Sequence, residues 1–317
     1  MKKKLHELLS QSKSVAIIGH IRPDGDDIGS GLGLYNYIKL NYCPDKLKLF
    51  MDEGPKKFNF LKSADEISHK LKEDDKDFDL VITSDASTFE RLGDFGVLLN
   101  DAKHSVCIDH HKSNAGFCEF NEIRPDSSST SEVLYEIIDN TRINKDIAEC
   151  IYTGIVNDTG VFKYSCTSKR TMEIAGNLLT YGIDSEDIIN KSFYSKSFNT
   201  IKAWGYAYEN AVLSEDGKCV YSIFTWKDMK RFNIGSIELD GISSELRNID
   251  TVEFSMLIYQ NGENEYKISM RSKDYVDVSE IGAKYNGGGH AHAAGCTLNG
   301  EPEKIAEDIL AEVRKQL

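Results

Sequence analysis

Short runs of β-branched and aliphatic residues alternate with helical patterns through about residue 185 of this 317-residue chain. The alternation predicts a parallel sheet flanked by helices, because the crossover between two parallel strands needs a connection of helical length. Each run ends in polar residues, and the functional side chains of such sheets gather beyond the carboxyl ends of the strands. The expected strands are residues 14–20, 46–52, 79–87 and 105–111.

Helical length and periodicity follow between and after these strands. The clearest helix is expected at residues 27–41, and others at about 130–140, 146–157 and 168–181. The polar and aromatic stretch SFYSKSFNTIKAWG that comes next is expected to be a linker with a bridging helix.

From about residue 206 the pattern changes to strands joined by tight turns. Strands are expected at 219–226, 251–260 and 265–272, and the last two flank NGEN, which predicts a β-hairpin. A helix near 277–286, the tract GGGH, a strand near AAGCTL and a final amphipathic helix complete a second, smaller α/β domain. The expected domains are therefore residues 1–185 and 206–317, joined by the segment 186–205.

The charge balance limits the partners of the chain. Its formal net charge is −13, whereas a protein that follows a long nucleic-acid backbone needs a basic stripe to displace condensed counterions. The charge therefore argues against long nucleic acid as a partner, although a small anion held by metal remains compatible with it.

Neither a signal peptide nor a membrane span is expected. The start, MKKKLHELLSQSKS, lacks an apolar run of signal-peptide length, and no window approaches the ~20 apolar residues of a membrane-spanning helix. The seven cysteines are scattered without a CxxC pair, which suits reduced thiols better than disulfides or a zinc ribbon. We expect a cytoplasmic protein that does not bind membranes.

Side chains that can hold a metal stand at the ends of four predicted elements. Three of these elements are parallel strands, whose carboxyl ends meet at one rim of a sheet, and the fourth is a helix. The side chains are His20, Asp24 and Asp26 after the first strand, Asp85 after the third, Asp109, His110 and His111 after the fourth, and Asp158 at the helix end.

Crowded carboxylates repel one another and protonate unless a cation compensates them, so a bound metal is the simplest explanation of this set. Imidazole and carboxylate ligands without thiolate favour a divalent ion such as Mn²⁺, with Mg²⁺, Co²⁺ or Fe²⁺ as competitors. Two ions ~3.5–4 Å apart, bridged by a carboxylate and a water or hydroxide, would use the whole set. Such a pair is suited to in-line hydrolysis of a phosphoester.

Taken singly, each of these residues has an ordinary alternative. A strand-end aspartate commonly caps a helix or forms a turn, and a lone histidine is more often a loop residue than a ligand. The ordered combination of H-x-x-x-D-x-D, a strand-end aspartate, Asp-His-His and a later aspartate favours the metal site.

GSGLG at residues 29–33 raises the alternative of a phosphate-binding loop. The segment lacks the G-x-G-x-x-G spacing, because Leu34 stands where the third glycine would be, and it lacks the lysine of a P-loop. We therefore expect glycines that let the first helix lie close to the sheet. Pro23 and Gly25 are expected to form the turn that directs the neighbouring acids inward.

A second candidate site lies in the C-terminal half, in GGGHAHAAG at residues 287–295. Three consecutive glycines let backbone amides approach a ligand closely, and nests of such amides bind anions, with a flexible turn as the alternative. Arg271, at the end of EYKISMRS, offers the guanidinium that suits phosphate, with a solvated strand-end arginine as the alternative.

At these residues the sequence resembles the DHH phosphoesterase superfamily, whose motif stands here as Asp109-His110-His111. The resemblance covers essentially the whole chain, because the C-terminal half is similar to the DHH-associated domain, with MRS and GGGHAHAAG in the expected order. Within the superfamily, the chain resembles the bifunctional oligoribonucleases and phosphoadenosine-phosphate phosphatases. The implied fold is α/β, with an N-terminal parallel-sheet domain and a smaller C-terminal α/β domain.

The resemblance implies a dinuclear manganese site and roles for the residues around it. His20, Asp24 and Asp85 would hold one ion, and Asp26, Asp85, His110 and Asp158 would hold the other, so that Asp85 bridges the pair. His111 would act on the scissile phosphate as a ligand or proton donor, and Asp109 would support the histidines. Arg271, Gly288, Gly289 and His290 would hold the far end of the nucleotide.

The reaction that the resemblance implies is hydrolysis of very short RNA to mononucleotides, and of 3′-phosphoadenosine-5′-phosphate to AMP, by a hydroxide that bridges two metal ions. A phosphodiesterase for cyclic di-AMP or for linear pApA is the nearest alternative, and a manganese pyrophosphatase is a more distant one. A nucleotide-binding regulator without catalysis is the alternative from another class. A homodimer is one arrangement that the sequence leaves open.

Overall fold

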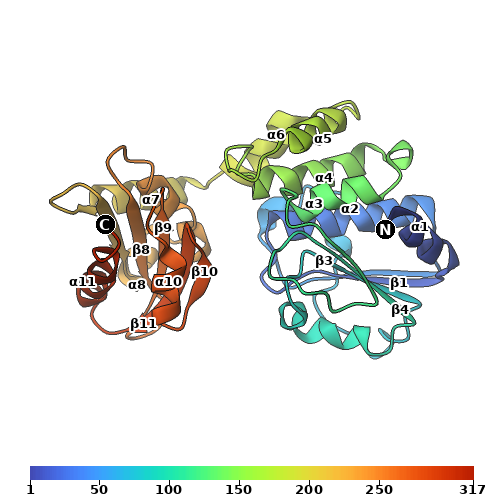
Figure 1. Ribbon diagram of the computed structural model, residues 1–317, viewed down its shortest axis with the longest axis horizontal. Coiled ribbons are helices and arrows are strands. Elements are labelled where there is room, and N and C mark those ends of the chain that lie inside the picture. Colours follow the sequence, from blue (N-terminus) through green and yellow to red (C-terminus); the bar gives the residue numbers. More distant parts are fainter. The chain divides into compact units, whose positions relative to one another are not determined.

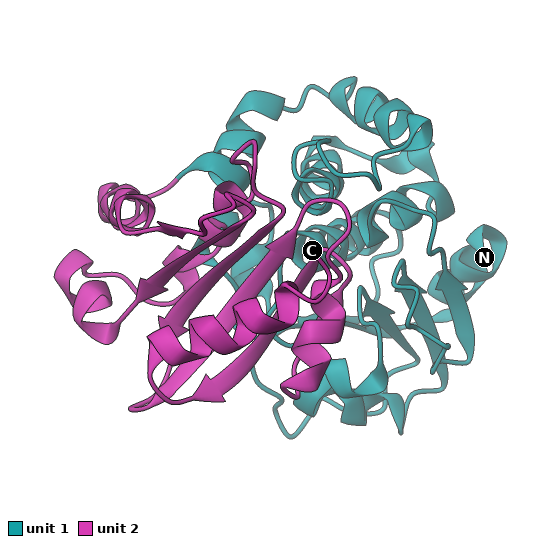
Figure 2. Cartoon of the chain, turned by 60° about the vertical axis from the view of Figure 1, so that its left-hand side comes forward, with its two compact units in different colours: residues 1–195 teal, residues 196–317 magenta.

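The computed structural model describes residues 1–317 and divides them into two compact units, residues 1–195 and residues 196–317 (Figure 1; Figure 2). Unit 1 contains a five-stranded sheet in the order β2-β1-β3-β4-β5, and every neighbouring pair in it is parallel. The strands are β1 (Ser14–Ile18), β2 (Lys46–Phe50), β3 (Leu80–Ser84), β4 (His104–Asp109) and β5 (Phe120–Ile123). The predicted parallel sheet is confirmed, whereas β5 had no clear signal in the sequence.

Both faces of this sheet are covered, which explains why its strands are continuous apolar runs rather than alternating ones. In β1, Val15 and Ile17 belong to one core, and Ala16 and Ile18 belong to the other. Helices pack on the first face, and the short helical segment η3 (Phe89–Leu99) covers the second. The helices of unit 1 are α1 (Lys2–Gln11), α2 (Gly25–Asn41), α3 (Thr130–Ile137), α4 (Lys145–Asp158), α5 (Lys169–Leu179) and α6 (Ser185–Ile189).

The glycines at residues 29–33 lie inside α2, so they do not form a phosphate-binding loop. A Cβ atom at Gly29 would meet the backbone nitrogen of Gly154 in α4 at 2.7 Å. A Cβ atom at Gly31 would meet the side chain of Met51, beyond the end of β2, at 2.3 Å. The glycines therefore allow close packing, as expected, but Gly29 faces a helix rather than the sheet.

Unit 2 contains a six-stranded mixed sheet in the order β10-β11-β9-β8-β7-β6, in which only β7 and β8 pair in parallel. The predicted hairpin is confirmed, because β8 and β9 pair antiparallel on either side of NGEN. The strands are β6 (Val212–Leu213), β7 (Cys219–Phe224), β8 (Phe254–Gln260), β9 (Glu265–Ser272), β10 (Gly288–His290) and β11 (Ala293–Asn299).

Helices cover both faces of the second sheet as well. One core joins the sheet to α10 (Val278–Lys284) and α11 (Pro302–Val313). The other core joins it to α7 (Phe198–Glu209), α8 (Trp226–Phe232) and α9 (Ile242–Leu246). A parallel-sheet domain followed by a smaller α/β domain, as expected from the sequence, is thus the observed fold class.

The segment 186–205, which we expected to be a linker with a bridging helix, is shared between the two units. Its first part belongs to α6 and packs against α4, through Ile188, in unit 1. Helix α7 begins at Phe198 and buries Ala203 in a core of unit 2. No helix of the structure is both long and apolar enough to cross a membrane.

Candidate metal centre

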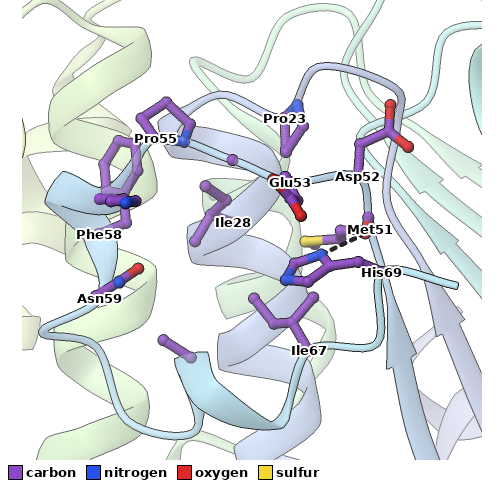
Figure 3. Close-up of a pocket in the computed structure, with 13 residues that line it drawn as sticks. Pro23, Ile28, Met51, Asp52, Glu53, Pro55, Phe58, Asn59, Ile67 and His69 are labelled. Atoms are coloured by element: carbon purple, nitrogen blue, oxygen red, sulfur yellow. Dashed lines mark hydrogen bonds between the residues drawn. The ribbon is translucent and has the colours of Figure 1, made fainter.

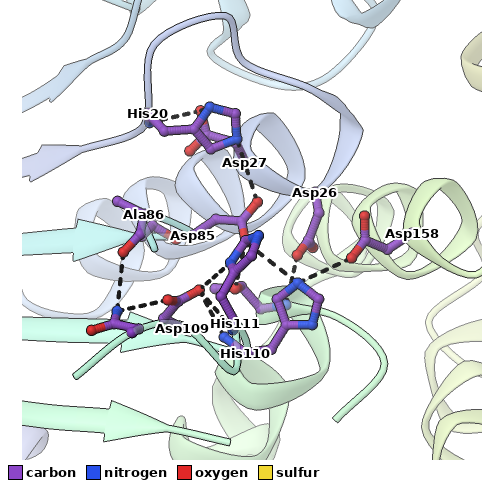
Figure 4. Close-up of polar contacts among 12 residues, drawn as sticks. His20, Asp26, Asp27, Asp85, Ala86, Asp109, His110, His111 and Asp158 are labelled. Atoms are coloured by element: carbon purple, nitrogen blue, oxygen red, sulfur yellow. Dashed lines mark hydrogen bonds and ion pairs between the residues drawn. The ribbon is translucent and has the colours of Figure 1, made fainter. Parts of the chain in front are cut away.

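The candidate ligands of unit 1 gather where β1, β3 and β4 end, next to the last residue of α4 (Figure 4). Three groups of their donor atoms each lie within 4.8 Å of one another. The groups are His20, Asp24 and Asp85; Asp26, His110 and Asp158; and Asp85, His110 and His111. The structure therefore brings together every metal ligand that the sequence suggested.

Asp85 stands between the first two groups. Its Oδ2 lies 3.7 Å from Nε2 of His20, and its Oδ1 lies 3.7 Å from Nε2 of His110. The backbone of Asp85 has φ 58°, a left-handed conformation that non-glycine residues rarely adopt and that is common at functional sites. Its backbone N–H donates to the carbonyl of Ile108 in β4, which fixes this conformation. The two oxygens of one carboxylate thus face two separate sets of ligands.

The remaining ligands are fixed by helix termini. Asp24 is the N-cap of α2, where its side chain accepts hydrogen bonds from the backbone N–H groups of Asp26 and Asp27. The Asp26 carboxylate accepts hydrogen bonds from the backbone N–H groups of Thr130, at 2.6 Å, and Ser131, at 3.0 Å, in the first turn of α3. The N-terminus of a helix favours an anion, so α3 fixes the position of the Asp26 carboxyl group and favours its ionised form, against the effect of burial.

The ring orientations of two histidines leave Nε2 facing the carboxylates. Nδ1 of His20 lies 2.9 Å from the carbonyl oxygen of Ile21, and Nδ1 of His110 lies 3.4 Å from that of Ser127. The tautomer with its proton on Nδ1 donates to these carbonyls and keeps a lone pair on Nε2, which is the arrangement that a metal-binding histidine needs, whereas the other tautomer of His20 would accept from Arg91 through Nδ1. Nε2 of His110 lies 3.2 Å from Oδ2 of Asp158.

The pKa shifts of the centre indicate an excess of negative charge that a cation would compensate. Burial, followed by the charge of Asp26, raises the pKa of Asp85 well above its usual value. Burial and the charge of Asp158 raise the pKa of Asp26 to about 7. Burial lowers the pKa of His110, but a hydrogen bond to Asp158 and the surrounding carboxylates outweigh it and raise that pKa to about 9. Each shift reduces excess negative charge, which is what a bound cation would do instead.

The donor set fits divalent cations. It consists of carboxylate oxygens and imidazole nitrogens without thiolate, which suits borderline-hard ions. Asp27, which the sequence analysis did not single out, is fully buried beside this set, and its Oδ1 has no hydrogen-bond partner. Its Oδ2 accepts a hydrogen bond from the backbone N–H of His20. Burial, followed by the charge of Asp24, raises the pKa of Asp27 well above its usual value, so this carboxyl too is held neutral unless a cation lies near it.

Asp109 lies behind the histidines rather than among the ligand groups. It is fully buried, and its Oδ1 accepts hydrogen bonds from the backbone N–H of His110, at 2.8 Å, and from Nδ1 of His111, at 2.7 Å. Its Oδ2 accepts one from Nδ2 of Asn114, at 2.6 Å. The geometry therefore suits a residue that orients His111, whereas contact between Asp109 and a substrate would need an open path that its burial does not offer.

Two further polar residues near the centre carried no signal that a single sequence could reveal. Nη2 of Arg91, which comes from η3, lies 2.9 Å from Nδ1 of His20. Asn114 holds Asp109 and also donates to the carbonyl of Ala86, at 3.0 Å. No motif fixes the number of residues between either of them and the candidate ligands that precede it. Only the folded structure therefore shows that Arg91 and Asn114 lie near the centre.

Replacing Asn114 by alanine is expected to lower kcat about tenfold while leaving metal content unchanged, because residues that orient an active-site group typically contribute 10–100-fold. Steady-state kinetics and elemental analysis of the purified variant would measure both. Asn121→Ala is the matched control, because Asn121 also bonds a nearby backbone, at Cys118, but does not contact Asp109. Equal losses in the two variants would contradict a role for Asn114 in orienting Asp109.

Two of the candidate substrate residues of unit 2, Arg271 and His290, lie in one row across three strands. Arg271 of β9 pairs with Ala293 of β11, and Ala293 pairs with His290 of β10. The tract GGGH is an exposed edge strand over Gly288–His290 rather than a flexible turn. A Cβ atom at Gly289 would lie 2.3 Å from the carbonyl oxygen of Ala293, so only glycine allows this pairing.

Comparisons with known proteins point to one family. The family model described as DHH family, N-terminal domain, matches residues 14–155, and the DHHA1 domain matches residues 216–317. The chain is 30% identical to the bifunctional oligoribonuclease and PAP phosphatase NrnA of Bacillus subtilis (strain 168), over 99% of this chain and 97% of that protein. A crystal structure of an exopolyphosphatase-related protein from Bacteroides fragilis superposes with a TM-score of 0.90 at 26% identity, over 98% and 95% of the two chains.

The cyclic-di-AMP phosphodiesterase PdeA of Listeria monocytogenes serotype 1/2a (strain 10403S) is 26% identical, over 99% of this chain and 48% of that protein. These matches confirm the resemblance seen in the sequence. The chain belongs to the DHH family, and it carries a DHHA1 domain after the DHH domain.

Proposed function

We propose that this chain is a manganese-dependent phosphoesterase that hydrolyses very short RNA oligonucleotides to mononucleotides and 3′-phosphoadenosine-5′-phosphate to AMP. The observation that carries the proposal is the carboxylate of Asp85, whose two oxygens face separate groups of ligands. The name of the B. subtilis relative, which covers nearly the whole chain, supports this choice of substrates.

The ligand groups define how the centre would hold two divalent ions. One ion would bind His20, Asp24 and Asp85, and the other would bind Asp26, Asp85, His110 and Asp158. When bound, such a pair lowers the pKa of water and neutralises negative charge on phosphoryl oxygens. In the overall reaction, water adds to phosphorus, the P–O bond to the leaving ribose oxygen breaks, and that oxygen takes up a proton.

His111 is the residue that we propose to supply this proton. Its Nδ1 donates to Asp109, which fixes the ring and stabilises a positive charge on it. A proton on Nε2 is then available for the leaving oxygen, and a positioned histidine is the most common general acid in enzymes. Nδ1 of the same ring lies 3.6 Å from Oδ1 of Asp85, which places His111 beside the candidate metal centre.

Unit 2 would bind the part of the nucleotide that is remote from the reacting phosphate. Arg271 suits a phosphate because its planar guanidinium can donate two parallel hydrogen bonds. Gly288, Gly289 and His290 are exposed at the edge of the same sheet. The substrate range would accordingly be short oligonucleotides and nucleotides, with long nucleic acid disfavoured by the net charge of −13.

We further propose that the protein works in the cytoplasm, where thiols stay reduced. All seven cysteines are free, which is consistent with that environment. A homodimer remains compatible with these features.

A second candidate function is hydrolysis of cyclic di-AMP or of linear pApA. The similarity to the Listeria phosphodiesterase favours it. A non-catalytic regulator is disfavoured because the structure retains every candidate ligand within the three donor groups.

A panel of substrates distinguishes these functions. Purified protein with Mn²⁺ would be given 3′-phosphoadenosine-5′-phosphate, linear di-adenylate, cyclic di-adenylate, a pentamer and a long RNA, and kcat/KM would be measured for each. We expect the first two to be cleaved with the highest kcat/KM and the long RNA with the lowest. A preference for the cyclic dinucleotide would favour the second function, and nucleotide binding without turnover under any divalent ion would favour the regulator.

A further inference from the structure

A pocket of about 380 Å³ lies in unit 1 at the end of β2, where residues 51–59 follow the strand (Figure 3). Its walls combine apolar side chains, among them Ile28, Met51, Phe58 and Ile67, with polar and charged ones. This volume falls at the lower end of the range for small-molecule sites, so it has room for one nucleoside rather than two.

Two residues that line the pocket are close neighbours in the sequence of the candidate metal ligands. Pro23, which lines the pocket, directly precedes Asp24, and Ile28 follows Asp26 by two residues on the first turns of α2. Asp52, which also lines the pocket, accepts a hydrogen bond from the backbone N–H of Arg22 at 3.3 Å. Strands β2 and β1 are neighbours in the sheet, so the pocket and the centre occupy adjacent positions on one rim.

The polar groups of the pocket favour an uncharged ligand. Asp52 and Glu53 contribute two negative charges, and Lys56 contributes one positive charge, so the lining carries a net charge of −1. A phosphate would be repelled by the two carboxylates, whereas the flat apolar faces of a nucleobase would match the apolar part of the walls.

The same groups define which edge of a base would fit. Nδ1–H of His69 donates to the carbonyl oxygen of Met51 at 2.9 Å, so Nε2 of the neutral ring is a hydrogen-bond acceptor. The carboxylate of Glu53 is also an acceptor. A base that presents N–H groups can satisfy both, and adenine, guanine and cytosine carry an exocyclic amino group. Uracil offers a single donor, N3–H, between two carbonyl oxygens, so it can satisfy at most one of these acceptors and sets a carbonyl oxygen against the other.

We propose that this pocket binds the base of the nucleotide next to the scissile phosphate and selects bases with an exocyclic amino group over uracil. The inference rests on the proposed hydrolysis of short oligonucleotides and adds a base preference to it. It assigns the substrate contacts nearest the metal centre to residues 51–69 of unit 1 rather than to unit 2 alone.

The test compares 5′-phosphorylated di-adenylate with 5′-phosphorylated di-uridylate on the Mn²⁺-loaded protein. We expect KM to be about tenfold higher for di-uridylate, because a bound uracil would cover Glu53 and His69, both exposed in the free protein, and leave one of them without a hydrogen-bond partner. Glu53→Gln should reduce this ratio, since its amide can donate to a uracil carbonyl. Glu73→Gln removes the same charge at an exposed position outside the pocket and should leave the ratio unchanged.

A second measurement does not depend on catalysis. Saturation-transfer NMR on the chelator-treated protein would report direct contact with adenosine and with uridine. We expect a stronger signal for adenosine, and loss of that signal in Asn59→Trp, whose indole would fill the pocket from its exposed edge.

The outcomes separate this inference from the function on which it rests. Equal KM values for the two dinucleotides, with Glu53→Gln and Asn59→Trp like the wild type in both assays, would overturn the pocket and leave the hydrolysis intact. Absence of turnover on every oligonucleotide would overturn the proposed function, and the adenosine signal and its loss in Asn59→Trp would still decide whether the pocket binds a base.

Discussion

Replacing Asp85 by asparagine is expected to lower turnover of short oligonucleotides at least about 10³-fold, the scale of losing one strong electrostatic contact in an active site. The amide keeps the shape of the side chain but removes the charge that faces both ligand groups. Metal content, measured by elemental analysis of the dialysed protein, should fall together with kcat. Normal activity with normal metal content would contradict a bridging role for Asp85.

The same variant should be more stable than the wild type when both are free of metal. Burial and neighbouring charges raise the pKa of Asp85 in the folded protein. Ionisation of Asp85 therefore lowers the free energy of unfolding as the pH rises above about 4, where an unfolded aspartate ionises. Asparagine lacks this charge, so thermal denaturation at pH 7 with chelator present should give a higher Tm for Asp85→Asn.

Asp79 provides a matched control in the same domain, because it precedes β3 whereas Asp85 follows it. Its hydrogen bond with Lys103 lowers its pKa to about 2, and it also accepts hydrogen bonds from the backbone N–H groups of Lys13 and Ser14. Because this pKa is lowered, ionised Asp79 stabilises the fold above about pH 4. Asp79→Asn should therefore lower Tm and leave metal content and kcat unchanged, which is the opposite pattern to Asp85→Asn.

Replacing His111 by alanine is expected to lower kcat about 10²-fold or more, the usual contribution of a positioned general acid. Metal content should stay near that of the wild type, because both ligand groups remain without His111. Added imidazole should restore part of the activity by occupying the space beside Asp109. His110→Ala, in contrast, should lose metal, since His110 belongs to one of those groups.

One result would change the role that we propose for His111 from proton donor to metal ligand. Its ring also lies in a donor group with Asp85 and His110. Loss of metal from His111→Ala, without rescue by imidazole, would identify His111 as a ligand rather than a proton donor.

Much of the ligand set could be predicted because strand ends are marked in the sequence. A buried parallel strand is a continuous apolar run, so the first polar residues after it, such as Asp85, are visible and lie at a known rim of the sheet. The residues that orient the ligands could not be found in this way. Arg91 reaches the centre from η3 and Asn114 reaches it from a loop, and their contacts depend on tertiary packing that no local period records.

The second unit shows a similar limit. A run of three glycines is typical of a turn, but here its last two residues belong to strand β10. Glycine is needed in this strand because the neighbouring strand leaves no room for a side chain at Gly289. The linker was predicted from its polar and aromatic composition. Composition alone does not distinguish an exposed connection from a helix such as α7, which buries small residues such as Ala203.

The packing of α2 against α4 extends the set of positions that control catalysis. A Cβ atom at Gly154 would lie 2.6 Å from Oδ1 of Asp26, and one at Gly29 would press on the backbone of α4, which ends at Asp158. The separation of these two carboxylates is thus determined by direct contact between two main chains. Adding a single methyl group at either glycine would change the reaction without altering any chemically reactive residue, so surveys restricted to polar side chains would overlook these sites.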